Sequence, residues 1–120
     1  EYYPLVMERI GESVTRLGCD GVVTINQGGA AMNACWVIEN APAVYFKFPK
    51  PERGGGSLWD YAASACIFAE LEGSVCSDVH GRALQLNRRG HTFMNEDGVV
   101  FASNREIGDE IYRLISELAG

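Results

Sequence analysis

In this 120-residue sequence, Asp60 has the side-chain type and position best suited to a catalytic or ligand-binding role. It follows three consecutive glycines, Gly54 to Gly56, at the point where an apolar helical pattern begins. Ser57 and Asp60 have the spacing of a capping box, and the helix dipole favours an acid in the first turn. A carboxylate at the mouth of a helix can also be a ligand of a divalent cation. The spacing leaves both interpretations open, and one residue can fill both roles.

A second candidate site is the turn Gly28-Gly29-Ala30, which lies between a predicted strand and a predicted helix. Small residues here leave the backbone N–H groups of a helix N-terminus uncovered, and such groups bind phosphate or hydroxyl oxygens. A plain strand-to-helix turn uses glycine as well, so the motif alone is weak. Lys47 is the third candidate, because a lysine can neutralise a phosphate, although a solvated strand residue explains it equally well.

Charge and cysteine usage exclude several classes of function. The net charge of −6 disfavours a nucleic acid polymer or an anionic membrane as the main partner. No apolar run approaches the length of a membrane span. The cysteines show no Cys-x-x-Cys spacing, which predicts buried, reduced thiols in a cytoplasmic protein rather than disulfides or a zinc site; they are Cys19, Cys35, Cys66 and Cys76.

The elements that must position these residues alternate between helices and short apolar strands. Apolar periodicity predicts helices at 4–17, 31–38 and 58–71 and a last one capped within 103–106, and strands at 22–25, 43–48, 75–79, 83–86 and 99–102. We expect the 22–25 strand to be buried and the 58–71 helix, which is poor in charge, to be covered on more than one side. Tyr61 and Phe68 are then packing groups. This pattern predicts one α/β domain over residues 1–120, with a mixed sheet flanked by helices.

Several of these segments occur in a familiar order. Trp59-Asp60-x-Ala62-Ala63, then Glu70 and Gly73, then Val75 to Gly81 and Val99 to Asn104, resemble the C-terminal half of the inositol monophosphatase family. This is a magnesium-dependent, lithium-sensitive phosphatase superfamily that also contains the 3'(2'),5'-bisphosphate nucleotidases. The resemblance implies Mg²⁺ as cofactor, Asp60 as a catalytic metal ligand, and the Gly28-Gly29-Ala30 turn as part of the substrate pocket.

The details of the resemblance bear on the class of substrate and on which of the family's motifs the sequence contains. Lys47-Phe48-Pro49 and the long loop to Ser57 resemble the nucleotidase branch, which implies a bisphosphate nucleotide as substrate ahead of inositol monophosphate. The family's usual hydroxyl residue in the glycine turn is replaced by Gly29. The motif Asp-Pro-x-Asp-Gly-Thr and the upstream metal-binding Glu do not occur in the sequence.

We therefore expect this sequence to be the C-terminal portion of a longer phosphatase and to be inactive as an isolated fragment. Its partners would be a small phosphorylated substrate and a missing N-terminal half, and the surface facing that half could drive homo-oligomer formation. The alternative is a noncatalytic module that keeps the fold and binds an anion or a protein.

Overall fold

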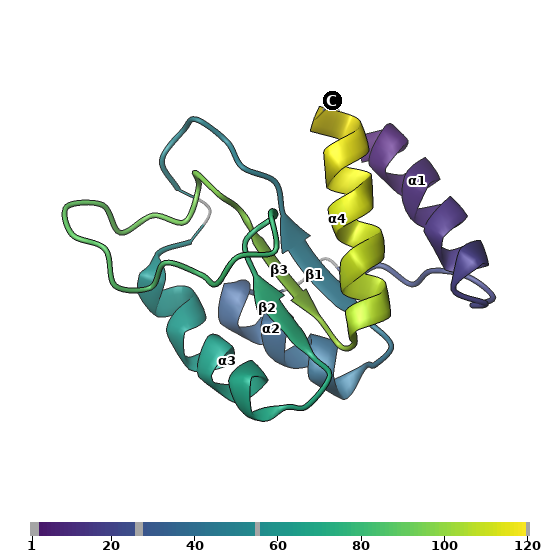
Figure 1. The fold of residues 1–120 in the computed structure, drawn as a ribbon, viewed down its shortest axis with the longest axis horizontal. Coiled ribbons are helices and arrows are strands. Elements are labelled where there is room, and N and C mark those ends of the chain that lie inside the picture. Colours follow the sequence, from purple (N-terminus) through teal and green to yellow (C-terminus); the bar gives the residue numbers. More distant parts are fainter. Residues whose placement is uncertain (1–2, 26–27, 55, 120) are drawn as a thin grey trace.

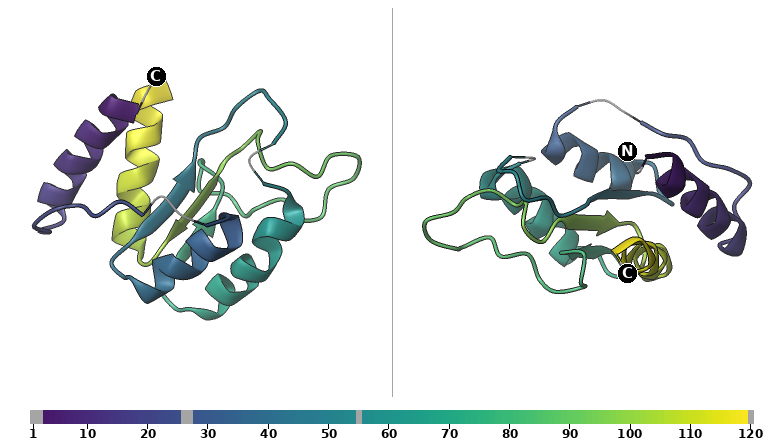
Figure 2. Two further views of the ribbon diagram at one scale, coloured as in Figure 1. Left: turned by 180° about the vertical axis from the view of Figure 1, so that it is seen from behind. Right: turned by 90° about the horizontal axis from the view of Figure 1, so that it is seen from above.

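A computed structural model describes residues 3–25, 28–54 and 56–119 (Figure 1). The helices and strands follow one another in the order α1 (Tyr3–Arg16), α2 (Ala30–Glu39), β1 (Val44–Lys47), α3 (Leu58–Glu70), β2 (Val75–Ser77), β3 (Val99–Ala102) and α4 (Arg105–Ala119). The strands form one sheet in the order β1-β3-β2, and both pairings are antiparallel. Helices α2 and α3 cover one face, and α4 covers the other with α1 outside it (Figure 2). The predicted α/β class is confirmed.

The central strand β3 explains why this layering is stable. All four of its residues are buried, and successive side chains point to opposite faces. Val99 and Phe101 pack among residues of α2 and α3, whereas Val100 and Ala102 pack with residues of α4. A continuous apolar run is the pattern of a strand buried on both faces. The sheet thus contributes side chains to two hydrophobic cores, one on each of its faces.

The ends of the outer helices follow their predicted signals. Gly18 follows α1 with a φ of 76°, which a residue with a side chain rarely adopts. Asn104 caps α4, because its Oδ1 accepts a hydrogen bond of 2.9 Å from the backbone N–H of Ile107. Arg16 of α1 and Glu110 of α4 form an ion pair of 2.8 Å that holds the two helices together. The first helix is shifted by one residue from its predicted bounds, and the last helix begins within the predicted capping segment.

The predicted strand at 22–25 is wrong. The structure assigns no strand there, and the Val23 side chain is 90 % exposed. A β-branched run becomes a strand only where a neighbouring strand satisfies its backbone, and no described strand lies beside this one. The described sheet is consequently antiparallel throughout, where the sequence predicted a mixed sheet.

The strand predicted at 83–86 is also absent. The chain turns at His80-Gly81 as expected, but the Asp78 side chain forms hydrogen bonds with the backbone of this turn. Its Oδ1 accepts hydrogen bonds from the backbone N–H groups of His80 and Arg82, at 2.8 and 2.9 Å. These local bonds replace the ladder that a hairpin would need.

Helix α3 is covered on one side only, contrary to expectation. Tyr61 and Phe68 are buried, which confirms their packing role, but Trp59 is 68 % exposed. The cysteine prediction is wrong in part, because Cys19 and Cys66 are exposed, although all four cysteines are free. Within the described residues, no helix combines the length and the apolar character that a membrane crossing needs.

Candidate functional site

Asp60 occupies the first turn of α3 in a capping box with Ser57. Its Oδ2 accepts a hydrogen bond of 2.7 Å from the backbone N–H of Ser57, and the Ser57 side chain caps the backbone of Asp60 in return. The structural interpretation of the spacing is therefore confirmed. Among the described residues, no hydrogen bond or ion pair engages the second carboxylate oxygen, Oδ1, and the side chain is half-buried. One oxygen thus fixes the helix, and the other is open to a ligand.

The turn at Gly28-Gly29-Ala30 lies at the start of α2. Gly29 is the N-cap residue, and among the described residues no side-chain capping bond is formed there. Gly28 has a φ of 76° and lies against the Trp36 ring, which a Cβ at this position would approach to 3.1 Å. The N-cap residue thus leaves the first N–H groups of α2 without a capping bond from its own side chain, and the role of this turn in binding stays a prediction.

Lys47 is the last residue of β1 and pairs with Val99 of β3. Alternation along the strand places it on the same face as Tyr45, which packs against the core beneath α2 and α3. Figures 1 and 2 show that β1 ends at the same end of the molecule at which α2 and α3 begin. The fold thus gathers at one end the three segments that carry Asp60, Lys47 and the glycine turn.

The first turn of α3 is held by a second loop, residues 87–98. Backbone hydrogen bonds join Lys50 N to Asn95 O (2.7 Å), Met94 N to Gly56 O (3.0 Å) and Leu58 N to Thr92 O (2.8 Å). These bonds tie both ends of the proline-glycine segment to one neighbouring stretch. No sequence motif predicts this pairing, since it joins residues more than thirty positions apart without a strand pattern.

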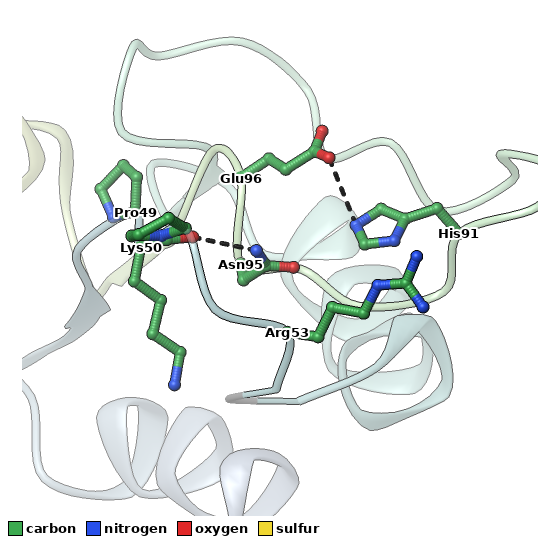
Figure 3. Close-up of a pocket in the computed structure, with 7 residues that line it drawn as sticks. Pro49, Lys50, Arg53, His91, Asn95 and Glu96 are labelled. Carbon is green, nitrogen blue, oxygen red and sulfur yellow. Dashed lines mark hydrogen bonds and ion pairs between the residues drawn. The ribbon is translucent and has the colours of Figure 1, made fainter.

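A pocket with a volume of about 540 Å³ opens between these two loops (Figure 3). Its lining consists of Pro49, Lys50, Pro51, Arg53, His91, Asn95 and Glu96. Asp60 and the glycine turn are not among these residues. Sequence reasoning missed this cavity, because its residues come from two loops of mixed charge without a motif.

Tyr61 lies directly beneath the start of α3. Its hydroxyl packs against Gly56, where a Cβ would lie 2.6 Å from the oxygen. Burial, the neighbouring Tyr45 and the nearby Asp60 carboxylate raise the pKa of Tyr61 well above its ordinary value. This phenol therefore stays neutral at physiological pH.

The described residues do not form a complete metal site. No three His, Cys, Asp or Glu side chains among them gather closely enough to hold a metal ion. The carboxylate of Asp60 has the right chemistry for a hard cation such as Mg²⁺, which takes oxygen ligands and keeps several waters. The part of the chain that the structure describes thus contains no group of three such ligands, and Asp60 could contribute one ligand to a larger site.

Comparison with known proteins gives one clear match. The model of the inositol monophosphatase family matches residues 6–119, which include all three strands, α2, α3, α4 and most of α1. The matched range also includes Asp60, Lys47 and the glycine turn. A search of curated proteins finds no match.

Proposed function

Since this chain belongs to the inositol monophosphatase family, we propose that it is part of a magnesium-dependent phosphomonoesterase and that Asp60 is a metal ligand in it. The family is one of phosphatases, and its members generally depend on a metal. The observation that carries the proposal is the divided role of Asp60. Its Oδ2 is used by the capping bond to Ser57, and no described group binds its Oδ1.

The capping bond orients the carboxylate that we assign to the metal. Ser57 is buried, and its N–H holds Oδ2 at 2.7 Å, so that the side chain has little freedom to rotate. A bound Mg²⁺ would neutralise phosphate oxygens and lower the pKa of a water molecule. One carboxylate competes poorly with the hydration shell of this ion. We therefore propose that the other carboxylates come from an N-terminal half of the same protein, which would carry the acidic motifs absent from this sequence.

The phosphate of the substrate is assigned to the start of α2. The first N–H groups of this helix lack a side-chain cap, and the helix dipole adds partial positive charge at the same point. Gly28 and Gly29 let a phosphate approach the backbone, because neither carries a side chain in its way. Backbone N–H groups would bind and orient the oxygens, and Ala30 contributes one of them.

Lys47 favours a substrate with a second negative group. An ammonium at this end of β1 would attract a second phosphate, whereas an acid would repel it. We therefore propose a 3'(2'),5'-bisphosphate nucleotide as substrate ahead of inositol monophosphate. The net charge of −6 supports a small metabolite rather than a nucleic acid polymer or a membrane. The four free cysteines support a cytoplasmic location.

A second candidate is a noncatalytic module that keeps the fold and binds an anion or a protein. The specific observation in its favour is the lack of three potential metal ligands in one place among the described residues. The two candidates differ in what happens when an N-terminal half is present. An enzyme gains activity from it, and a noncatalytic module does not.

Phosphate release from adenosine 3',5'-bisphosphate and from inositol 1-phosphate, with and without Mg²⁺, tests the proposal. We expect residues 1–120 alone to be inactive, the protein joined to its N-terminal half to be active, and Asp60→Asn to abolish that activity. Glu70→Gln, at the other end of the same helix, is the matched control and should stay active. Magnesium-dependent hydrolysis by residues 1–120 alone would contradict the need for a second half. Full activity of Asp60→Asn would contradict the metal role.

A further inference from the structure

The pocket between the two loops is separate from the residues assigned to catalysis. It is lined by residues of the 49–53 segment on one side and of the 91–96 segment on the other (Figure 3). Its volume of about 540 Å³ lies in the range that small-molecule sites occupy. None of the proposed catalytic or phosphate-binding residues contributes to its lining.

The two walls of the pocket are joined by two hydrogen bonds between Lys50 and Asn95. Lys50 N donates to Asn95 O at 2.7 Å, and the Asn95 side-chain Nδ2 donates to Lys50 O at 2.9 Å. Asn95 is only 6 % exposed, so this double link is shielded from water. The backbone position of Lys50 is therefore set by this double link, and Arg53 lies three residues further along the same loop.

The pocket contains uncompensated positive charge. Neither Lys50 nor Arg53 forms an ion pair with any described residue. Glu96 is the acid in the lining, but Arg88 (3.3 Å) and His91 (3.5 Å) already face it. Segments 48–57 and 87–98 carry four of the ten basic residues of the chain and only three of its sixteen acids. The two segments thus carry a net charge of +1 in a chain whose net charge is −6.

A buried polar atom of the lining lacks a partner as well. No described group donates a hydrogen bond to Asn95 Oδ1, which is shielded from solvent. In Figure 3 this oxygen points toward the space between Arg53 and His91. Buried acceptors in native proteins are normally satisfied, so an orphaned one inside a pocket indicates a missing donor. The Arg53 side chain is exposed, and its movement would let the hydroxyl or amine of a ligand reach this oxygen.

We propose that this pocket binds a small ligand that carries an oxyanion, a phosphate or a carboxylate, together with a hydroxyl or amine. Lys50 and Arg53 bind the anion, for which an ammonium and a planar guanidinium are the suitable side chains. Asn95 Oδ1 accepts the hydrogen bond of the neighbouring donor. The site does not require Asp60 or a metal, and it is therefore independent of the proposed phosphatase reaction.

Titration of residues 1–120 with inorganic phosphate and with citrate, followed by amide NMR in the presence of EDTA, tests this site. EDTA removes divalent cations, so binding through Asp60 and a metal does not contribute. We expect shifts at residues 50–54 and 91–96, and about tenfold weaker binding in Lys50→Gln/Arg53→Gln. The probe that binds more tightly identifies the oxyanion. Asp60→Asn should bind both probes as the unchanged chain does.

The matched control is Arg89→Gln, which removes one exposed charge from the 87–98 loop without touching the pocket lining. It should leave the affinity within about twofold. Equal losses in Arg89→Gln and in the double variant would mean a general charge effect and overturn the proposal. Shifts confined to residues 28–31, at the start of α2, would overturn it too, because the anion would then occupy the helix N-terminus instead.

Discussion

The two roles of Asp60 can be separated by the choice of substitution. Asp60→Ala removes both carboxylate oxygens, so the backbone N–H of Ser57 loses its acceptor at 2.7 Å. Asp60→Asn keeps an oxygen that can accept this hydrogen bond and removes only the charge. The first variant should therefore unfold more easily, whereas the second should keep most of the stability while losing any metal-binding capacity.

The expected magnitude follows from the burial of the cap. Ser57 is 6 % exposed, so its backbone N–H group could not form a hydrogen bond with water in place of the lost carboxylate. An unsatisfied buried donor costs about 1–3 kcal/mol, and losing the interaction with the helix dipole adds about 0.3–1 kcal/mol. Alanine has a higher helix propensity than aspartate, which offsets roughly 0.5 kcal/mol of this loss of stability. We expect a net loss of about 2 kcal/mol for Asp60→Ala and less than about 1 kcal/mol for Asp60→Asn.

Urea unfolding followed by far-UV circular dichroism measures both changes as shifts of the midpoint at constant slope. Glu70→Ala is the matched control, because Glu70 is exposed and lies in the last turn of α3, where a negative charge opposes the dipole. This variant should be as stable as the parent or slightly more stable. Equal stability of Asp60→Ala and the parent would refute the capping argument, and equal losses in the Ala and Asn variants would refute the assignment of the hydrogen bond.

Two further predictions concern the packing around α3 and the sheet. Gly56→Ala should destabilise the fold by more than about 2 kcal/mol, because its φ is 113° and the new Cβ would lie 2.6 Å from the Tyr61 hydroxyl. Gly90→Ala, with a φ of 73° and no atom within 4 Å of the added Cβ, should cost about 1 kcal/mol in the same urea experiment. Burial raises the pKa of the Cys76 thiol to about 11, so stability is intact below about pH 9 and falls as the pH rises toward 11, by at most about 1.4 kcal/mol per pH unit. Cys76→Ala should flatten the decline of the urea midpoint between about pH 9 and pH 11, and an unchanged decline would contradict the burial of the thiol.

Local signals predicted the helices and the central strand well. Asn104 and the first turn of α4 form a cap that could be read directly from the sequence, and Val99 to Ala102 form the continuous apolar run of a strand buried on both faces. The capping box of Asp60 was likewise predictable, because the relevant residues are only three positions apart. Signals of this kind depend on neighbours along the chain, and tertiary structure did not override them.

Signals that depend on distant partners were harder to interpret. The β-branched run at 22–25 has strand propensity, yet propensity does not supply the neighbouring strand that its backbone needs. Asp78 replaced the expected second strand of a hairpin by bonding to its own turn. The sequence did not predict the pocket around Asn95 either, because its two walls come from distant segments that meet only after folding. The proposed roles of Lys47 and the glycine turn stay predictions.

The backbone links around the start of α3 also govern which length changes the chain can tolerate. Lys50 and Gly56 are bonded to Asn95 and Met94, two adjacent residues, so the chain between Lys50 and Gly56 leaves and returns at almost the same point. Extra residues inserted in this excursion would extend into solvent and add only a small loop-closure cost. A deletion between Gly56 and Leu58 would instead pull Leu58 away from Thr92 and unwind the start of the helix. Homologues should therefore vary freely in length within the excursion and keep a constant spacing from Gly56 to Asp60.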